Sequence, residues 1–408
     1  AATHYEPESH PCDSGFFVVF FVIWLPLSFV GLGILFVNMM MVDTTSNFTL
    51  YTQEHMLDLN ILWWGRSDTN YSRNRVIRTC LKRLGCSFSE FNPINSKLGL
   101  IEAYLRRPKR PSLIWVPCFR QRDMSSAAIW AKKHNLPLVF DPLISAYDKQ
   151  VFERKKITVE DTKAVKLLNW EKRLFQKATI VVGDTREHCN YFHSTFGVEQ
   201  SRLIDIPVGA EEDLFKPAVN SSDNNSPITV LFYGSFLGLQ GPLSIIEATK
   251  KYRGTKVQWK LIGDGPLLNQ CKKEAAGIDC ISFLPWVPYE QLPRYIQNAD
   301  ILLGIFGTSE KAHRVIPNKV YQTLACGKPL VTMRSPAYPE GFTTNGDLGI
   351  HWVTPGNAGE LACTIAKLTK QREHLHDEGD KAYNTFIKYF SETDIEQRLH
   401  KALKQFCP

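Results

Sequence analysis

The stretch ILLGIFGTSEKAHRVIPNKVYQTLACGKPLVTMR, at residues 301–334, decides the fold of this chain. Its apolar start at residues 301–306 predicts a buried strand, and a polar, basic loop follows it. Pro317 suits the first turn of a helix, and Gly327 suits the left-handed residue past the helix end. A second apolar strand is predicted at residues 330–333. The succession of strand, loop, helix and strand is the repeating unit of an α/β domain.

Two cations make this loop and helix a candidate anion site. Arg314 stands in the loop, and Lys319 stands at the start of the predicted helix. Helix N-termini attract anions, and ligands of α/β domains bind at the carboxyl ends of the strands. The alternative is an ordinary crossover whose basic loop is only solvated surface, and these residues alone do not decide between the two.

The segment PNKVYQTLACGKPLV, at residues 317–331, resembles the donor-site helix of glycosyltransferase family 4. The resemblance continues in order and spacing through IGDGP (262–266), ILLGIF (301–306) and RSPAYPEGF (334–342). The segment DPLISAYDKQVFERKK, at residues 141–156, resembles the acceptor side of family 4 enzymes of the bacterial surface-polysaccharide type, and family 4 enzymes are retaining. The resemblance implies an α/β chain of the GT-B type, with two Rossmann-like domains that face a central cleft.

The predicted elements divide the chain into five parts. They are residues 1–55, a tail with a hydrophobic segment; residues 56–217, a Rossmann-like acceptor domain; residues 218–227, a polar linker; residues 228–382, a Rossmann-like donor-binding domain; and residues 383–408, a helix expected to pack back on the first domain.

The hydrophobic segment, at about residues 15–42, is long enough to span a bilayer and predicts a transmembrane anchor. It lacks the basic start and the short length of an ordinary cleaved signal peptide. The alternative is an upstream extension from a misassigned start, because the chain begins with Ala1 and Met56 stands just before the first strand.

Charge and cysteine content narrow the partners. All 48 Lys and Arg residues lie after position 65, so the body is basic and suits sugar nucleotides or anionic lipid. No nucleic-acid motif is present. Ten cysteines without a CxxC pair or zinc-like spacing argue for a reducing compartment and against a metal site. We therefore expect a membrane-associated protein whose catalytic body lies in the cytoplasm.

The resemblance assigns the donor to the second domain. The candidate donor-binding residues are Gly234, Ser235, Gln240, Gly241, Gly263, Asp264, Arg314, Lys319, Gln322 and Glu340. Family members usually carry cations near the position of Gln240, and two glutamates eight positions apart that fall here at Arg314 and Gln322. We hypothesise that Arg314 and Lys319 are the catalytic residues, which replace the missing cations at the diphosphate, and that Gln322 hydrogen-bonds the ribose.

The resemblance and the carboxyl ends of the first-domain strands indicate the acceptor residues. They are Gly65, Arg66, Tyr71, Asp141, Tyr147 and Asp148. Two alternatives stay open, because Arg66 can be a plain surface charge and Asp141, before a proline, can be a turn residue.

These features predict a metal-independent, retaining glycosyltransferase. It would move a sugar from a nucleotide-diphospho-sugar, as co-substrate, to a glycan or a lipid-linked acceptor. No other cofactor is expected. Two rivals remain: a catalytically silent GT-B protein that binds a sugar nucleotide, and a GT-B sugar-nucleotide epimerase.

Overall fold

The computed structural model describes residues 56–154, 156–218, 226–344 and 346–407. They belong to one compact unit, Tyr51–Pro408. The predicted anchor and most of the predicted linker lie outside the described residues. Within the described ranges, no helix combines the length and the apolar composition that crossing a bilayer requires.

The first half of this unit is built on a six-stranded sheet with the strand order β2-β1-β3-β4-β5-β6. Its strands are β1 (Asn60–Trp64), β2 (Ser87–Phe91), β3 (Leu113–Val116), β4 (Leu138–Phe140), β5 (Ile180–Gly183) and β6 (Leu203–Asp205). All neighbouring strands are parallel. The inner strands are apolar along nearly their whole length, because helices cover both faces of the sheet.

The helices of the first half connect these strands. They are α1 (Ser72–Arg83), α2 (Gly99–Arg106), α3 (Met124–His134), α4 (Ala146–Asp148) with a π-helical turn at Lys149–Glu153, α5 (Thr162–Phe175) and α6 (Arg186–Phe196). The helices α2, α3, α5 and α6 share one apolar core with the sheet, and α1 shares the other.

The second half repeats the design with the order β12-β11-β10-β7-β8-β9, again with every pair parallel. Its strands are β7 (Ile228–Tyr233), β8 (Val257–Ile262), β9 (Ile281–Leu284), β10 (Ile301–Leu303), β11 (Leu330–Met333) and β12 (Ile350–Val353). The helices are α7 (Pro242–Lys251), α8 (Leu268–Glu274), α9 (Leu292–Gln297), α10 (Asn318–Ala325), α11 (Ala358–Lys370) and α12 (Leu375–Tyr389). Two parallel six-stranded sheets confirm the expected α/β class.

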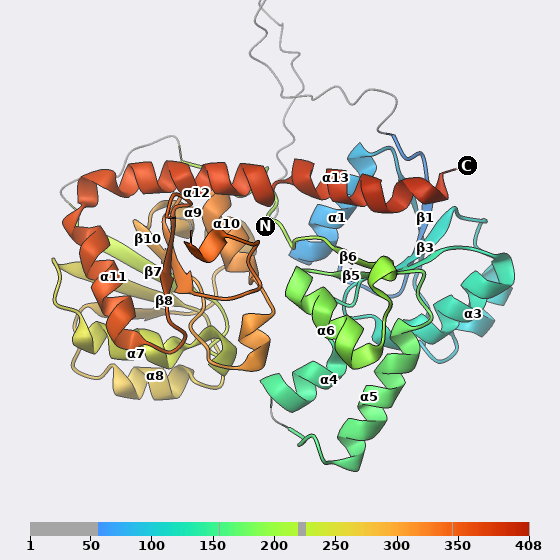
Figure 1. Cartoon of the computed structure of the whole chain (residues 1–408), viewed down its shortest axis with the longest axis horizontal. Helices are drawn as coiled ribbons and strands as arrows, with labels where there is room; N and C mark the ends of the chain where they lie inside the picture. The colour runs from blue at the N-terminus through green and yellow to red at the C-terminus, as the bar shows by residue number, and fades with distance from the viewer. Residues whose placement is uncertain (1–55, 155, 219–225, 345, 408) are drawn as a thin grey trace, which may run out of the picture. The chain divides into compact units, whose positions relative to one another are not determined.

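Helices lie on both faces of this second sheet (Figure 1). The helices α7, α8 and α11 cover one face and α9, α10 and α12 cover the other. The alternation within β7 explains this, because Val230 and Phe232 enter the first core while Leu231 and Tyr233 enter the second.

The quoted stretch folds largely as predicted. It forms β10, α10 and β11, and Gly327 adopts φ +62° just past the helix. Pro317 differs slightly, since it is the N-cap residue before α10 and not part of the first turn. Its extended backbone (ψ 154°) keeps it outside the helix.

The last helix, α13 (Glu392–Leu403), packs on α1 of the first half (Figure 1). Ile395 and Leu399 join the core formed by α1 and the first sheet. Glu392, at the start of α13, lies 2.5 Å from Arg83 of α1, and its backbone N–H donates to Glu212 at 2.6 Å. The contact between α1 and α13 therefore contains a buried carboxylate beside both a cation and a second acid.

This carboxylate makes the stability of the chain depend on pH near neutrality. Burial, with Glu212 adding to it, raises the pKa of Glu392 to about 7 in spite of Arg83. The folded chain then binds more protons than the unfolded chain from about pH 4.5 to about pH 7. Stability therefore falls as pH rises through this window, by up to about 3 kcal/mol.

We expect Glu392→Gln to be more stable than the parent above pH 7 and to lose this advantage toward pH 5. Melting temperatures measured across pH 5–9 test this. Glu199→Gln, at an exposed glutamate, is the control and should follow the parent. Parallel pH profiles of Glu392→Gln and the parent would show that Glu392 does not titrate in this range.

Candidate functional site

Four loops of the second half leave the carboxyl ends of the neighbouring strands β11, β10, β7 and β8. Eight of the predicted donor residues lie in these loops: Gly234, Ser235, Gln240, Gly241, Gly263, Asp264, Arg314 and Glu340. Lys319 and Gln322 lie on α10, which follows the loop after β10. Because the strands are parallel, these loops gather at one edge of the sheet.

Two glycines let the loops after β7 and β8 touch. Gly234 and Gly263 adopt φ +145° and +134°, where other residues are strained. A Cβ on Gly263 would overlap the carbonyl oxygen of Gly234. A Cβ on Gly234 would lie 3.0 Å from the Lys319 ammonium and 3.4 Å from Gln240 Oε1. Because Gly234 has no side chain, its backbone lies next to the Lys319 ammonium group and Gln240 Oε1 without anything between them.

Lys319 is a buried cation without a carboxylate partner among the residues that the structure describes. Its side chain is almost fully buried, with Nζ 3.7 Å from the centroid of the Phe232 ring and 3.4 Å from the Gly304 carbonyl oxygen. Burial holds the pKa of Lys319 well below its usual range. Beside it, Gln240 Oε1 is buried and accepts no hydrogen bond from the described residues. The ammonium form of Lys319 is therefore costly in the ligand-free chain, and an anionic ligand bound beside it would stabilise that form.

Arg314 does not join Lys319; it binds residues of the first half. Its Nη2 lies 2.7 Å from Asp148 Oδ1, and its guanidinium stacks 4.4 Å from the centroid of the Tyr191 ring. Its carbonyl oxygen accepts a hydrogen bond from Thr185 Oγ1 at 2.5 Å. The structure thus brings a predicted donor cation onto a predicted acceptor carboxylate.

A second cation strengthens this contact. Lys311 pairs closely with Glu153 and lies 3.7 Å from Asp148 Oδ2. Lys311, Glu153 and Tyr191 were not among the predicted site residues, and the signal that could have indicated Lys311 is its position in the same basic loop.

Gln322 is held in a chain of hydrogen bonds beneath α10. Tyr233 donates to Gln322 Oε1 at 3.0 Å, and Gln322 Nε2 donates to the Tyr289 oxygen at 3.1 Å. Tyr289 in turn donates its proton to Glu211 at 2.9 Å, and Ser72 donates to the same carboxylate at 3.0 Å. Because Tyr289 has given its only proton to Glu211, it needs a donor on its other side. An amide at position 322 supplies that donor, and a carboxylate cannot.

The predicted acceptor residues lie in different surroundings. Asp141 is buried and paired with Arg73 Nε at 3.0 Å, and burial raises the pKa of its carboxyl. Tyr147 is buried against Phe152. Arg73 also donates to the carbonyl oxygens of Ile206 and Pro207, so this pair ties α1 to β4 and to the end of β6.

Three further acceptor candidates lie where the first loop leaves β1. Arg66 is exposed, and Gly65 adopts φ +126° beside Arg120 and Asp123. Tyr71 is half-buried, and burial raises its pKa to about 12. In the second half, Ser235 is half-buried, Glu340 is exposed, and Asp264 is exposed and accepts a hydrogen bond from the Gly265 N–H.

Comparison with known proteins shows what the second half of the chain resembles. The sequence model of a family described as Glycosyl transferases group 1 matches residues 227–371, the part that holds the predicted donor-binding residues. The amylovoran biosynthesis glycosyltransferase AmsK of Erwinia amylovora is 28% identical over 189 residues, which are 43% of this chain and 46% of that protein. The second half of the chain is similar to group 1 glycosyltransferases. The chain matches less than half the length of the curated relatives, 46% of one and 37% of the other.

Solved structures show the same fold. The crystal structure of Anabaena Alr3699/HepE in complex with UDP superposes with a TM-score of 0.63 at 15% identity, and covers 85% of this chain and 100% of its own. Sucrose-phosphate synthase from Thermosynechococcus elongatus gives a TM-score of 0.64 at 15% identity, over 85% of this chain and 98% of its own.

The hydrogen-bond chain at Gln322 predicts the outcome of restoring the glutamate that the resemblance expects. In Gln322→Glu, a second buried carboxylate faces Glu211 across the Tyr289 phenol, whose single proton cannot serve both, and the hydrogen bond from Nε2 is lost. We expect a loss of about 2 kcal/mol in the free energy of unfolding, measured by urea denaturation. Adding Glu211→Gln returns a donor to Tyr289 and should recover at least half of the loss. A Gln322→Glu chain as stable as the parent would contradict this account.

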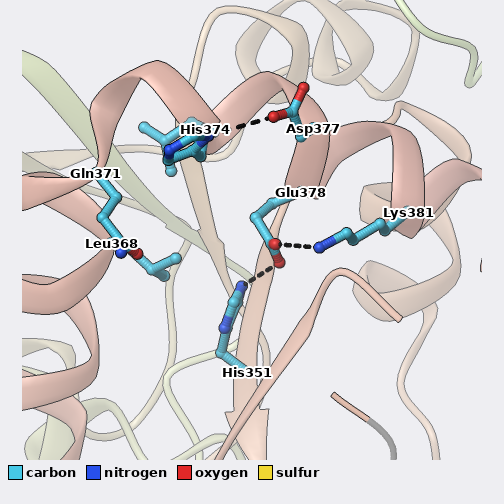
Figure 2. A pocket seen from close by; sticks show the side chains of 8 residues that line it. His351, Leu368, Gln371, His374, Asp377, Glu378 and Lys381 are labelled. Carbon is cyan, nitrogen blue, oxygen red and sulfur yellow. Dashed lines mark hydrogen bonds and ion pairs between the residues drawn. The ribbon is translucent and has the colours of Figure 1, made fainter. Parts of the chain in front are cut away.

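A cavity of about 260 Å³ lies elsewhere in the second half, between β12, α11 and α12 (Figure 2). In Figure 2, Glu378 stands between His351, at 3.1 Å, and Lys381, at 2.8 Å. Its charge is therefore compensated within the chain. No group of three metal-ligating side chains capable of holding an ion occurs in the described part of the chain.

Proposed function

We propose that this chain is a retaining glycosyltransferase that moves a sugar from a nucleotide-diphospho-sugar to a glycan or lipid-linked acceptor. The observation that carries the proposal is the buried Lys319 ammonium beside Gly234, which has no carboxylate partner among the described residues. The group 1 family match over the same loops and the UDP bound by the HepE neighbour support a nucleoside diphosphate as the compensating anion.

In this proposal two cations of the chain, Lys319 and Arg314, compensate the negative charge of the diphosphate during the reaction. Lys319 and the backbone at Gly234 bind the diphosphate, with the N-terminus of α10 beside them. Arg314 moves from Asp148 toward the diphosphate as the bond between sugar and phosphate breaks, and stabilises the leaving nucleoside diphosphate. These two cations remove the need for a metal ion.

The acceptor side of the proposal uses the first half of the chain. Tyr147 and Asp148, in α4, would orient an acceptor hydroxyl once Arg314 has left Asp148, together with Arg66 and Tyr71, which follow β1. We place the protein at a membrane, with its catalytic body on the cytoplasmic side, in the synthesis of a surface polysaccharide.

Thermal melting of the full chain with nucleoside diphosphates and their sugars tests the proposal. UDP, GDP, ADP and dTDP are compared at equal concentration, because a ligand at 100 times its Kd stabilises by about 2.7 kcal/mol. We expect one nucleotide to raise the melting temperature, and its sugar form to be consumed by transfer or by slow hydrolysis.

The other outcomes separate the rivals. Stabilisation without any turnover of the sugar nucleotide would indicate a silent binding protein. Conversion of the sugar without an acceptor would indicate an epimerase. A melting temperature that no nucleotide changes would overturn the donor site itself.

A further inference from the structure

An apolar face on α2 and the loop before it points outward. Ile94, Leu98, Ile101 and Leu105 are 71%, 51%, 58% and 77% exposed. Ile101 and Leu105 lie one turn apart on one side of α2, Leu98 is the N-cap residue of the helix, and Ile94 lies in the loop before it. The opposite side of α2 packs inward through Ala103. We call these four residues the α2 face. Single exposed leucines are ordinary, but four exposed aliphatic side chains within twelve consecutive residues indicate a contact surface.

Cations are frequent in the segment that carries the α2 face and on the helix packed against α2. Five of them lie in residues 94–110: Lys97, Arg106, Arg107, Lys109 and Arg110. The neighbouring helix α3 adds Lys132 and Lys133, and Lys133 Nζ lies 4.2 Å from the centroid of the Tyr104 ring.

Glu102 is the single acid in residues 94–110, and its carboxylate already has partners within the chain. It accepts hydrogen bonds from the Ile94 and Asn95 N–H groups and pairs with Arg106 at 3.2 Å. Because this one acid is already paired with Arg106, the other four cations of the segment keep their positive charge available for a partner.

We infer that the α2 face docks on the surface of an anionic lipid bilayer. Exposed aliphatic side chains accompanied by several Lys and Arg residues are typical of an interfacial helix, whose apolar side enters the headgroup boundary while its cations meet anionic lipid. A second copy of this chain fits less well, because it would bring two sets of cations together. The exposed residues are aliphatic, which favours lipid over the stacked bases of nucleic acid.

The position of the face gives it a role in the reaction. The loop that carries Ile94 follows β2 at the carboxyl edge of the first sheet, and Phe91 accepts a hydrogen bond from the Gly65 N–H at 2.9 Å. Arg120, beside Gly65, donates to Ser96 of the same loop at 3.4 Å. The docking surface thus adjoins the proposed acceptor residues. It deepens the proposed function, on which it rests, by indicating that the acceptor is carried by lipid.

Hydrogen–deuterium exchange of the full chain in nanodiscs tests the inference locally. Nanodiscs of phosphatidylcholine alone are compared with nanodiscs that also contain phosphatidylglycerol. We expect amides in residues 94–106 to exchange at least about fivefold more slowly in the anionic discs, and this protection to fade as salt is raised. Association through the apolar N-terminal segment would be common to both disc types and would not produce this difference.

Two charge-reversed variants provide the matched comparison. Lys109→Glu/Arg110→Glu removes cations beside the face and should abolish the protection, whereas Lys272→Glu/Lys273→Glu makes the same charge change on α8 and should keep it. Equal exchange in the two disc types, or equal loss in both variants, would overturn the inference. Protection that appears without lipid and grows with protein concentration would assign the face to a second copy and overturn it as well.

The same variants keep this inference separate from the donor site. Absence of lipid protection with an intact nucleotide-induced rise in melting temperature would overturn only the docking surface. Lipid protection without any effect of nucleotides would overturn only the proposed reaction.

Discussion

Lys319→Met is expected to abolish donor binding and, at the same time, to raise the melting temperature of the ligand-free chain. The parent buries the Lys319 amine, whose Nζ lies 3.4 Å from the Gly304 carbonyl oxygen, and burial penalises its charged form. Methionine fills a similar volume without a charge, so the free chain should gain about 1–3 kcal/mol. The diphosphate loses its buried cation, so affinity should fall at least about a hundredfold.

The two opposite effects are read from one set of melting curves, with and without the stabilising nucleotide. Lys328→Met is the matched control, because Lys328 lies just past the other end of α10 and burial also lowers its pKa. Its nucleotide-induced shift should equal that of the parent. A Lys319→Met chain that keeps the full shift would show that the ammonium does not bind the donor.

The parts of the fold that sequence reasoning predicts well are those with local signals. The strand at β10, the helix after Pro317 and the left-handed Gly327 are each dictated by neighbours along the chain. The edge that gathers the donor loops follows from the parallel order of the strands. These inferences need no knowledge of distant contacts.

The parts that it misses depend on residues far apart in the sequence. Arg314 pairs with Asp148, which is 166 positions away in the sequence. An amide fits at position 322 because Tyr289 donates its proton to Glu211 and accepts a hydrogen bond from Gln322. The burial of Lys319, on α10, involves Phe232 on β7, which is 87 positions away in the sequence. No local pattern records these contacts.

Helix α2 shows a different limit. Periodicity places Ile101 and Leu105 on one side of a helix, but it does not say whether that side faces the core or the solvent. A hydrophobic row that is exposed therefore looks the same in the sequence as one that is buried, and only the fold distinguishes a core helix from a docking surface.

Arg314→Met and Asp148→Asn together separate the structural role of this ion pair from its proposed role in the reaction. Asp148 is fully buried, so Arg314→Met leaves its carboxylate with Lys311 alone, 3.7 Å away. We expect a cost of about 3 kcal/mol in the free energy of unfolding. The double variant removes both charges and should regain most of that stability.

Turnover of the sugar nucleotide should behave differently. If Arg314 stabilises the leaving diphosphate, kcat falls about a hundredfold in Arg314→Met and stays low in the double variant, although its stability has returned. Asp148→Asn alone releases Arg314 from its partner and should tighten donor binding. If turnover instead recovers together with stability, Arg314 only holds the two halves in contact, and Lys319 must supply the positive charge alone.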